Sequence, residues 1–132
     1  MTMRSRRRGF TLIELLIVIV IIGVLAAITL VRYWAVRERA HLTAVQSDLR
    51  QVATYQELYH EKNLQYASTV ADLAQFDPSP GVTVTLTAAT ATGWAATATH
   101  AVINPRQCGL FYGDAAAADA PPAQYLGAVA CN

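Results

Sequence analysis

Residues 10–31 read FTLIELLIVIVIIGVLAAITLV, an apolar run that contains one acidic residue, Glu14, near its start. As a helix this stretch would be about 33 Å long, which matches the hydrocarbon core of a bilayer. Residues 1–9 before it are polar and rich in arginine, and their basic side chains are Arg4, Arg6, Arg7 and Arg8. Basic residues ahead of an apolar span favour an N-terminus in the cytoplasm. The sequence therefore predicts one membrane-spanning helix in this orientation.

The helical pattern continues past the apolar run. Apolar residues recur at steps of three or four positions, which places them on one face of a helix: Leu42, Val45, Leu49, Val52, Tyr55 and Tyr59. The opposite face, with Gln46, Arg50, Glu57 and Glu61, is expected to be solvated. No proline occurs between Phe10 and Lys62, so one helix can cover the whole region. Its second half is predicted to pack on a core, whereas its first half is apolar on every side.

The rest of the chain has the pattern of a small sheet. Residues 64–81 are predicted to hold a short helical turn, capped by Ser68 or Thr69 and ending at Leu73. The predicted strands are 81–87, 94–103 with Trp94 in the core, and 107–112; residues 114–122 are predicted to be a loop, and 125–130 are a candidate fourth strand. Short connections between successive strands favour antiparallel pairing. The predicted fold class is therefore α+β.

Charge and motifs favour no enzyme and no nucleic-acid partner. Of ten Lys and Arg, four lie in residues 1–9, so six remain against nine Asp and Glu, a net charge of −3 without that segment. This leaves no basic stripe for nucleic acid. The chain has no nucleophile motif, phosphate loop or metal-ligand spacing, and His41, His60 and His100 are scattered, the first two expected at the helix surface. No catalytic residue, cofactor or metal is predicted.

The chain has two cysteines, Cys108 and Cys131, whose spacing fits no zinc motif. In an exported protein the default is one disulfide. It would close a loop of about 24 residues and contribute roughly 3 kcal/mol to stability. The alternative, two buried free thiols, requires a reducing compartment.

The N-terminus admits three interpretations. A cleaved secretory signal needs a shorter apolar region, although Val24-Leu25-Ala26 has the composition of a cleavage site. A plain signal anchor fits the length but leaves Glu14 unexplained. A carboxylate inside an apolar span is costly, and by default it has a function.

The third interpretation comes from the string RGFTLIELLIVI, residues 8–19, which closely resembles the N-terminal signature of type IV prepilins, a family that includes the pseudopilins of type II secretion. The resemblance implies cleavage between Gly9 and Phe10 by a prepilin peptidase, and N-methylation of Phe10. It implies a pilin fold, with a long helix packed on an antiparallel sheet of three or four strands. The implied organisation is a leader at 1–9, a transmembrane and filament-core segment at 10–35, and a periplasmic or extracellular head at 36–132.

The resemblance also implies a role for Glu14, which would pair with the amine of Phe10 in a neighbouring subunit. Phe10 and Glu14 are four residues apart, so pairing within one chain is an open alternative. In the family a disulfide encloses the C-terminal region, and Cys108 and Cys131 match that pattern. Major pilins often carry proline at the position of Val31, and Asp114 and Asp119 are too few for the calcium site of major pseudopilins and are expected to be solvated.

The implied function is a structural subunit that polymerises into a type IV pilus for adhesion, motility or DNA uptake. Alternatives are a type II secretion pseudopilin, a minor pilin that primes or caps the filament, and a bitopic membrane protein that does not polymerise. The implied partners are other copies and other pilins, the peptidase, the assembly platform of the inner membrane, and the bilayer. The precursor is expected in the inner membrane and the product in a pilus on the cell surface.

Overall fold

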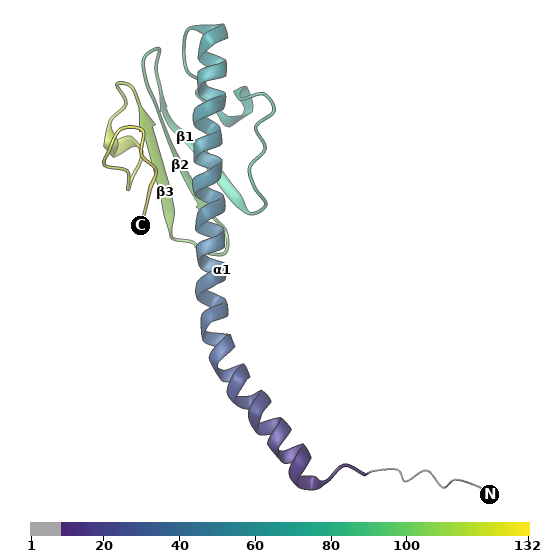
Figure 1. Cartoon of the computed structure of the whole chain (residues 1–132). Coiled ribbons are helices and arrows are strands. Elements are labelled where there is room, and N and C mark those ends of the chain that lie inside the picture. Colours follow the sequence, from purple (N-terminus) through teal and green to yellow (C-terminus); the bar gives the residue numbers. More distant parts are fainter. Residues whose placement is uncertain (1–8) are drawn as a thin grey trace, which may run out of the picture. The chain divides into compact units, whose positions relative to one another are not determined.

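The computed structural model describes residues 9–132 (Figure 1). Arg4, Arg6, Arg7 and Arg8 lie outside the described residues. Contacts divide the chain into two units, Met1–Arg37 and Glu38–Asn132. One helix, α1 (Leu12–Asn63), runs through both.

The start and the end of α1 have local causes. At the start, the Glu14 amide donates to the hydroxyl of Thr11 at 3.3 Å and the Leu15 amide donates to the Thr11 carbonyl at 3.2 Å. At the end, Leu64 takes a left-handed conformation with φ 56°, and its amide donates to the His60 carbonyl at 2.8 Å. A left-handed residue directly after the last turn is a common helix terminator. The prediction of one unbroken helix is confirmed.

Four strands form one antiparallel sheet in the order β1-β2-β3-β4. They are β1 (Val82–Ala89), β2 (Trp94–His100), β3 (Gln107–Tyr112) and β4 (Ala130–Cys131). The α+β pilin fold, with a long helix on an antiparallel sheet, is confirmed. The short helical turn is η1 (Val70–Asp72), and its N-cap is Thr69 rather than Ser68.

Three strand boundaries differ from the sequence prediction, the first being the start of β1 at Val82 rather than at residue 81. β1 continues past residue 87 to Ala89 because the register shifts between Leu86 and Ala88, so pairing with β2 resumes after the irregularity. β2 ends at His100 rather than at residue 103, because the next residues turn and the Ile103 amide donates back to the His100 carbonyl at 3.1 Å.

The candidate fourth strand at 125–130 does return to the sheet, but it is shorter and lies later in the chain than predicted, at Ala130–Cys131. Residues 125–129 form turns and irregular structure, with Gly127 at φ 72° and its amide donating to the Phe111 carbonyl at 2.9 Å. Only Ala130 and Cys131 pair with β3, opposite Gly109 and Cys108. The segment 114–122 is not entirely loop either, since it contains a short 3-10 helix, η2 (Ala117–Asp119).

The core of the second unit lies between α1 and one face of the sheet, as Figure 1 shows. Every residue of the predicted stripe belongs to it: Val45, Leu49 and Val52 are buried, and Leu42, Tyr55 and Tyr59 are partly buried. Trp94 is fully buried, as predicted. On the other face, Ala120 and Ala123 cover Ala95 and Phe111 and form a second, smaller core.

Candidate functional site: the N-terminal helix and the head

The bond between Gly9 and Phe10 lies before the first helical residue. Both residues are exposed, Phe10 at 76%, and neither belongs to a helix or strand. Apart from the two neighbours of Gly9 in the chain, no atom of the described residues lies within 4 Å of the position that a Cβ would take on it. A processing enzyme could therefore reach this bond without unwinding α1.

Glu14 lies in the first turn of α1 and is exposed. Negative charge is favourable at this end of a helix, because the unpaired amides and the helix dipole present positive charge there. Thr11 and Glu14 have the spacing of a capping box, in which the first residue accepts from the backbone of the second. The pattern Thr-x-x-Glu is readable in the sequence, but the sequence analysis missed it.

The structure does not bring Phe10 and Glu14 together as neighbours on one helix. Phe10 lies outside α1, which begins at Leu12. Among residues 9–132 the Glu14 carboxylate makes no hydrogen bond and no ion pair.

Among residues 9–30 and 32–37 of the first unit, every apolar residue is exposed. The most apolar stretch of α1 has a mean hydropathy of 3.0 and is 0% buried, and by length and composition this helix could cross a membrane. Its one polar side chain after Glu14, Thr29, bonds within the helix to the carbonyls of Leu25 and Ala26, both at 3.1 Å. The stretch is thus suited to an apolar environment that the chain itself does not supply.

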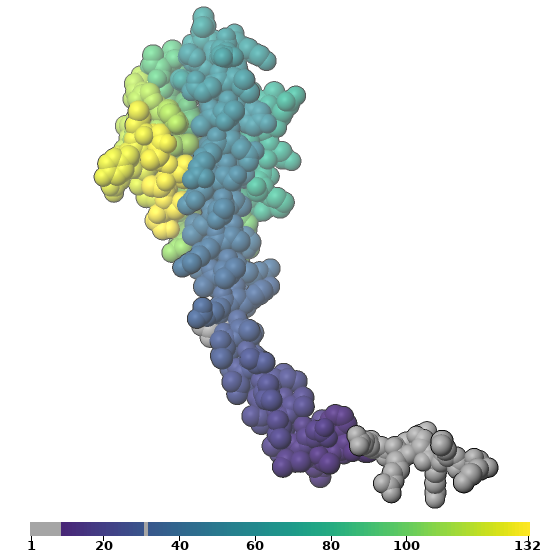
Figure 2. Space-filling model, in the orientation of Figure 1, coloured from purple at the N-terminus to yellow at the C-terminus, as the bar shows by residue number. Residues whose placement is uncertain are grey.

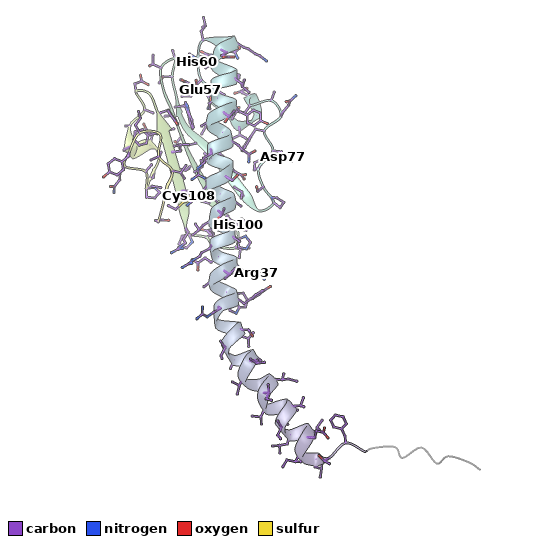
Figure 3. The ribbon with its side chains drawn as sticks, viewed as in Figure 1. Arg37, Glu57, His60, Asp77, His100 and Cys108 are labelled. Atoms are coloured by element: carbon purple, nitrogen blue, oxygen red, sulfur yellow. A yellow bond between two sulfur atoms is a disulfide. The ribbon has the colours of Figure 1, made fainter. Side chains whose placement is uncertain are left out.

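The head is closed by a disulfide between Cys108 and Cys131, which are paired across β3 and β4. Cys108, labelled in Figure 3, is fully buried. Gln46 was predicted to be solvated, but it is half-buried, and its side-chain amide lies 3.4 Å from the Cys131 sulfur. The disulfide joins the C-terminal segment to the sheet, and Figure 2 shows that segment in yellow on one flank of the head.

Two buried polar side chains attach the segment after α1 to the helix. The carboxylate of Asp48, 1% exposed, accepts from the amide and the hydroxyl of Ser79 at 2.7 and 2.9 Å. The side chain of Gln56, 0% exposed, donates to the Ala67 carbonyl at 3.0 Å and accepts from the Ala67 amide at 2.8 Å. Neither side chain was predicted to be buried, although each lies beside the apolar stripe.

Asp114 is exposed, as expected, and it also has a structural role. Its carboxylate accepts from the hydroxyl of Thr92 at 2.6 Å and from that of Thr90 at 2.9 Å. These bonds tie the turn between β1 and β2 to the segment after β3. The Thr92 hydroxyl, and then that of Thr90, lower the pKa of Asp114 by stabilising its charged form.

The histidines are placed by packing. His41 and His60, which were predicted at the helix surface, are both partly buried. His100 is buried, and its ring lies against that of His41 in a tilted arrangement with the centroids 4.1 Å apart. His100 Nδ1 accepts from the Val102 amide at 3.1 Å. His60 bonds to the Ala91 carbonyl at 3.0 Å and stacks on Tyr66 at 4.4 Å. Each imidazole thus supports the packing of the head.

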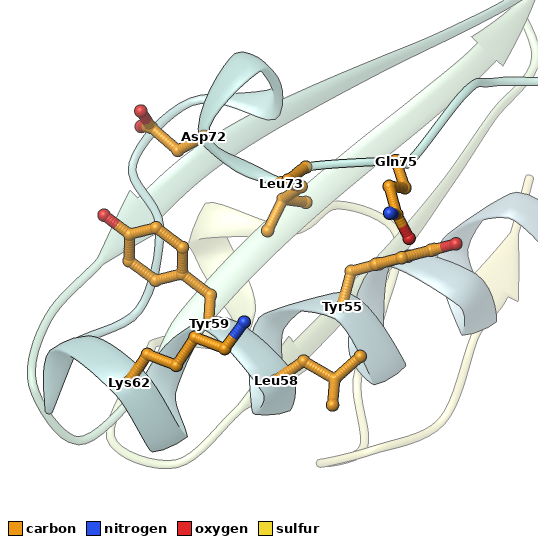
Figure 4. A pocket seen from close by; sticks show the side chains of 8 residues that line it. Tyr55, Leu58, Tyr59, Lys62, Asp72, Leu73 and Gln75 are labelled. Atoms are coloured by element: carbon orange, nitrogen blue, oxygen red, sulfur yellow. The ribbon is translucent and has the colours of Figure 1, made fainter.

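A hollow of about 240 Å³ lies between α1 and the segment after it. Figure 4 shows its lining, which is mainly apolar and phenolic: Tyr55, Leu58, Tyr59, Lys62, Asp72, Leu73 and Gln75. Asp72 accepts from the amide and hydroxyl of Thr69, at 3.3 and 2.7 Å, so it stabilises the cap of η1. Within residues 9–132, no three His, Cys, Asp or Glu side chains gather into a metal-binding group.

Residues 4–30 match the family described as the prokaryotic N-terminal methylation motif. The chain is 38% identical over 96 residues to the type IV wide pilus major component PilA4 of Thermus thermophilus, covering 70% of this chain and 73% of that protein.

Two further relatives match over shorter stretches. The chain is 32% identical over 77 residues to the type II secretion system core protein G of Pseudomonas aeruginosa, covering 58% of this chain and 54% of that protein. It is 46% identical over 52 residues to the type IV major fimbrial protein FimA of Dichelobacter nodosus, covering 39% of this chain and 33% of that protein. The chain belongs to the type IV pilin and pseudopilin family.

Proposed function

We propose that this chain is a prepilin, a structural subunit that is processed after Gly9 and polymerises into a type IV pilus through the first half of α1. The observation that carries the proposal is the apolar first unit, which could cross a membrane and has none of its most apolar stretch buried by the chain itself. Such a helix needs either lipid or copies of itself. Similarity to the major pilus component PilA4 over 96 residues supports the second destination.

Processing would precede assembly. The exposed, non-helical Gly9–Phe10 bond supports cleavage by a prepilin peptidase, followed by N-methylation of Phe10. The arginine-rich leader, with Arg4, Arg6, Arg7 and Arg8, would keep this end in the cytoplasm, and the peptidase would act at that face of the inner membrane. Cleavage creates an ammonium group at Phe10.

Assembly would then pair this new charge with Glu14 of a neighbouring subunit. Lipid is as apolar as leucine, so burial alone does not drive helices together in the bilayer. Helix packing and the pairing of two charges that are each costly in hydrocarbon supply the preference for the filament. The assembly platform of the inner membrane would extract the subunits. The helix start at Leu12 in the uncut chain favours pairing between subunits over pairing within one.

The organisation that fits this function is a leader at 1–9, a transmembrane and filament-core segment at 10–35, and a head at 36–132. The head would lie outside the cytoplasm, where its disulfide can form and persist. The pilus would then be displayed at the cell surface. The family relatives named above are pilins and a secretion protein, which supports a structural rather than an enzymatic role.

The second candidate is a pseudopilin of a type II secretion system. The observation that favours it is the similarity to core protein G over 77 residues. The two functions differ in their product. Deletion of the gene would remove surface fibres if the chain is a major pilin, would retain exoproteins in the periplasm if it is a pseudopilin, and would lower fibre number if it is a minor pilin.

Intact mass of the protein from native membranes tests the proposal. We expect loss of residues 1–9 and the gain of one methyl group, and a Gly9→Leu variant should keep its leader. Protein that retains the leader and stays monomeric in cells that shed fibres would contradict the proposal. It would favour the bitopic membrane protein that does not polymerise.

A further inference from the structure

A cluster of aromatic and basic side chains follows the apolar stretch in the first unit. Tyr33 and Trp34 are 55% and 68% exposed, and their ring centroids lie 6.2 Å apart in an edge-on arrangement. The guanidinium of Arg37, labelled in Figure 3, lies over the Tyr33 ring at 5.3 Å from its centroid. Arg32 is exposed beside them. We name Arg32, Tyr33, Trp34 and Arg37 the interfacial belt.

The position of the belt matches the thickness of a bilayer. From Leu12 to Tyr33 the helix rises about 32 Å at 1.5 Å per residue, close to the roughly 30 Å of the hydrocarbon core. When the start of α1 lies at one surface of the membrane, the two rings reach the other. Tyr and Trp are favoured at that level, because their rings are apolar and their O–H and N–H groups meet water and headgroups.

The charge of the belt selects an anion. No acidic residue occurs between Glu14 and Glu38, so the segment that carries Arg32 and Arg37 contains no carboxylate to neutralise them. Guanidinium groups bind phosphate oxygens in pairs of hydrogen bonds. The stacking of Arg37 on the face of Tyr33 orients this cation while the edge of its guanidinium can still donate.

The belt covers about 200° of the helix circumference rather than forming one narrow stripe. Successive helical residues project about 100° apart, so Arg32, Tyr33 and Trp34 point in three different directions. A single protein partner would contact one face, whereas lipid headgroups contact all of them. This geometry favours a ring of lipids as the occupant.

We infer that the interfacial belt is a binding site for the phosphate of anionic phospholipids in the outer leaflet of the inner membrane. The inference rests on the membrane insertion in the proposed function and names the lipid that holds the precursor there. By fixing the depth of α1 at one surface, the belt places the Gly9–Phe10 bond at the opposite surface. Lipid at the belt would thus help to set the position at which the leader is removed.

The test uses the full-length chain in vesicles and the fluorescence of Trp34. The other tryptophan, Trp94, is fully buried in the head. A Trp34→Phe variant gives the fluorescence of Trp94 alone, which is subtracted from that of the wild type. Lipids brominated at shallow or deep acyl positions report the depth of Trp34. Brominated phosphatidylglycerol and brominated phosphatidylcholine, each as a minor component among unlabelled lipids, report which headgroup gathers around it.

We expect the strongest quenching of Trp34 from shallow bromines, and a preference for phosphatidylglycerol over phosphatidylcholine of about fivefold for each arginine engaged. Replacing Arg32 and Arg37 by glutamine should remove the preference and leave Trp34 in the membrane. Arg50→Gln, a matched charge removal in the head, should leave the preference unchanged.

Equal quenching by the two headgroups, or strongest quenching by deep bromines, would overturn the belt and leave the proposed function intact. Absence of quenching at every depth would overturn membrane insertion itself, and this inference with it.

Discussion

At the scale of single residues, the acid near the start of α1 combines two conditions. Glu14 lies where the helix favours negative charge, yet its carboxylate has no partner among residues 9–132. A group that is compatible with the helix start and still unpaired is suited to bind a charge from another molecule.

We predict that Glu14→Gln leaves processing and membrane insertion unchanged and lowers fibre yield at least tenfold, because the neutral side chain cannot pair with the Phe10 ammonium. Fibres sheared from cells and measured by immunoblot give the yield. Thr11→Ala is the control, since it removes the helix cap and keeps the charge. Wild-type yields from Glu14→Gln would refute the pairing between subunits.

We predict that Gln56→Leu destabilises the head by about 2–4 kcal/mol, since it leaves both the amide and the carbonyl of Ala67 buried without partners. Denaturant unfolding of the full chain in detergent, followed by Trp94 fluorescence, measures the change. Gln51→Leu, on the exposed face of the same helix, should alter stability by less than about 0.5 kcal/mol. Equal effects of the two substitutions would show that the bonds to Ala67 contribute nothing.

The burial of a residue could be predicted when it depends on the pattern of its own element, and not when it depends on partners far away in the sequence. Trp94 and the stripe through Val45, Leu49 and Val52 could be predicted because apolar residues follow the period of their own element. Asp48 and Gln56 could not, since their burial depends on backbone groups of Ser79 and Ala67 that the fold brings to them.

At the scale of elements, the end of α1 is strained. Leu64 takes φ 56°, a conformation that costs an L-residue with a side chain about 1–2 kcal/mol and costs glycine little. The side chain of Leu64 is 78% exposed, so its removal sacrifices little burial.

We predict that Leu64→Gly stabilises the head by about 1 kcal/mol, through relief of the left-handed conformation. Gln51→Gly, which also introduces glycine but in the middle of the helix, should instead destabilise by about 1 kcal/mol. Thermal unfolding followed by circular dichroism distinguishes the two signs. Loss of stability in both variants would mean that Leu64 is not strained.

The turn between β1 and β2 depends on pH through Asp114. Because hydrogen bonds from Thr92 and Thr90 lower the pKa of this carboxyl in the folded state, its charged form is favoured by folding. Its contribution to stability is therefore present above the ordinary pKa of aspartate, near 4, and is lost as pH falls through the lower folded value.

We predict that the wild-type head loses stability below about pH 4 and that Asp114→Asn, which is less stable at pH 7, loses less over the same range. Midpoints of urea unfolding between pH 2.5 and 7 provide the measurement. Parallel curves for the two proteins would exclude Asp114 as a source of the acid sensitivity.

Prediction of elements succeeded where side chains alternate and failed where they do not. Val82 and Val84 are buried between exposed threonines, which made β1 readable. β4 consists of Ala130 and Cys131, and its place is set by pairing with Gly109 and Cys108 rather than by any pattern of its own. The 3-10 helix η2 lies in a run of alanines that has no period.

At the scale of the whole molecule, the two units differ in whether their apolar residues are exposed or buried. The apolar stretch in Met1–Arg37 is exposed and apolar on every side, whereas Glu38–Asn132 buries its apolar residues in its own two cores. The sequence predicted this contrast because composition changes along the helix. It could not predict how Ala120 and Ala123 cover the back of the sheet, since a small residue gives no sign of which surface it will meet.

We predict that a fragment of residues 38–132 is a soluble monomer in its oxidised form, whereas the full chain requires detergent or lipid. The reason is that most of the large exposed apolar side chains lie in the first unit. Size-exclusion chromatography with light scattering measures the mass. A fragment that elutes as large oligomers at micromolar concentration would contradict the division.

The order of the strands also governs how fast the head can form. Each strand pairs with the one next in the chain, and only residues 90–93 and 101–106 separate the first three. Such low contact order favours rapid hairpin closure, because little chain entropy is lost with each step. The widest closure, over residues 113–129, is the one that the covalent bond between Cys108 and Cys131 spans. Oxidation of the two cysteines thus stabilises the pairing of β3 with β4 once the rest of the sheet has formed. Without the disulfide, this pairing would be the first to be lost.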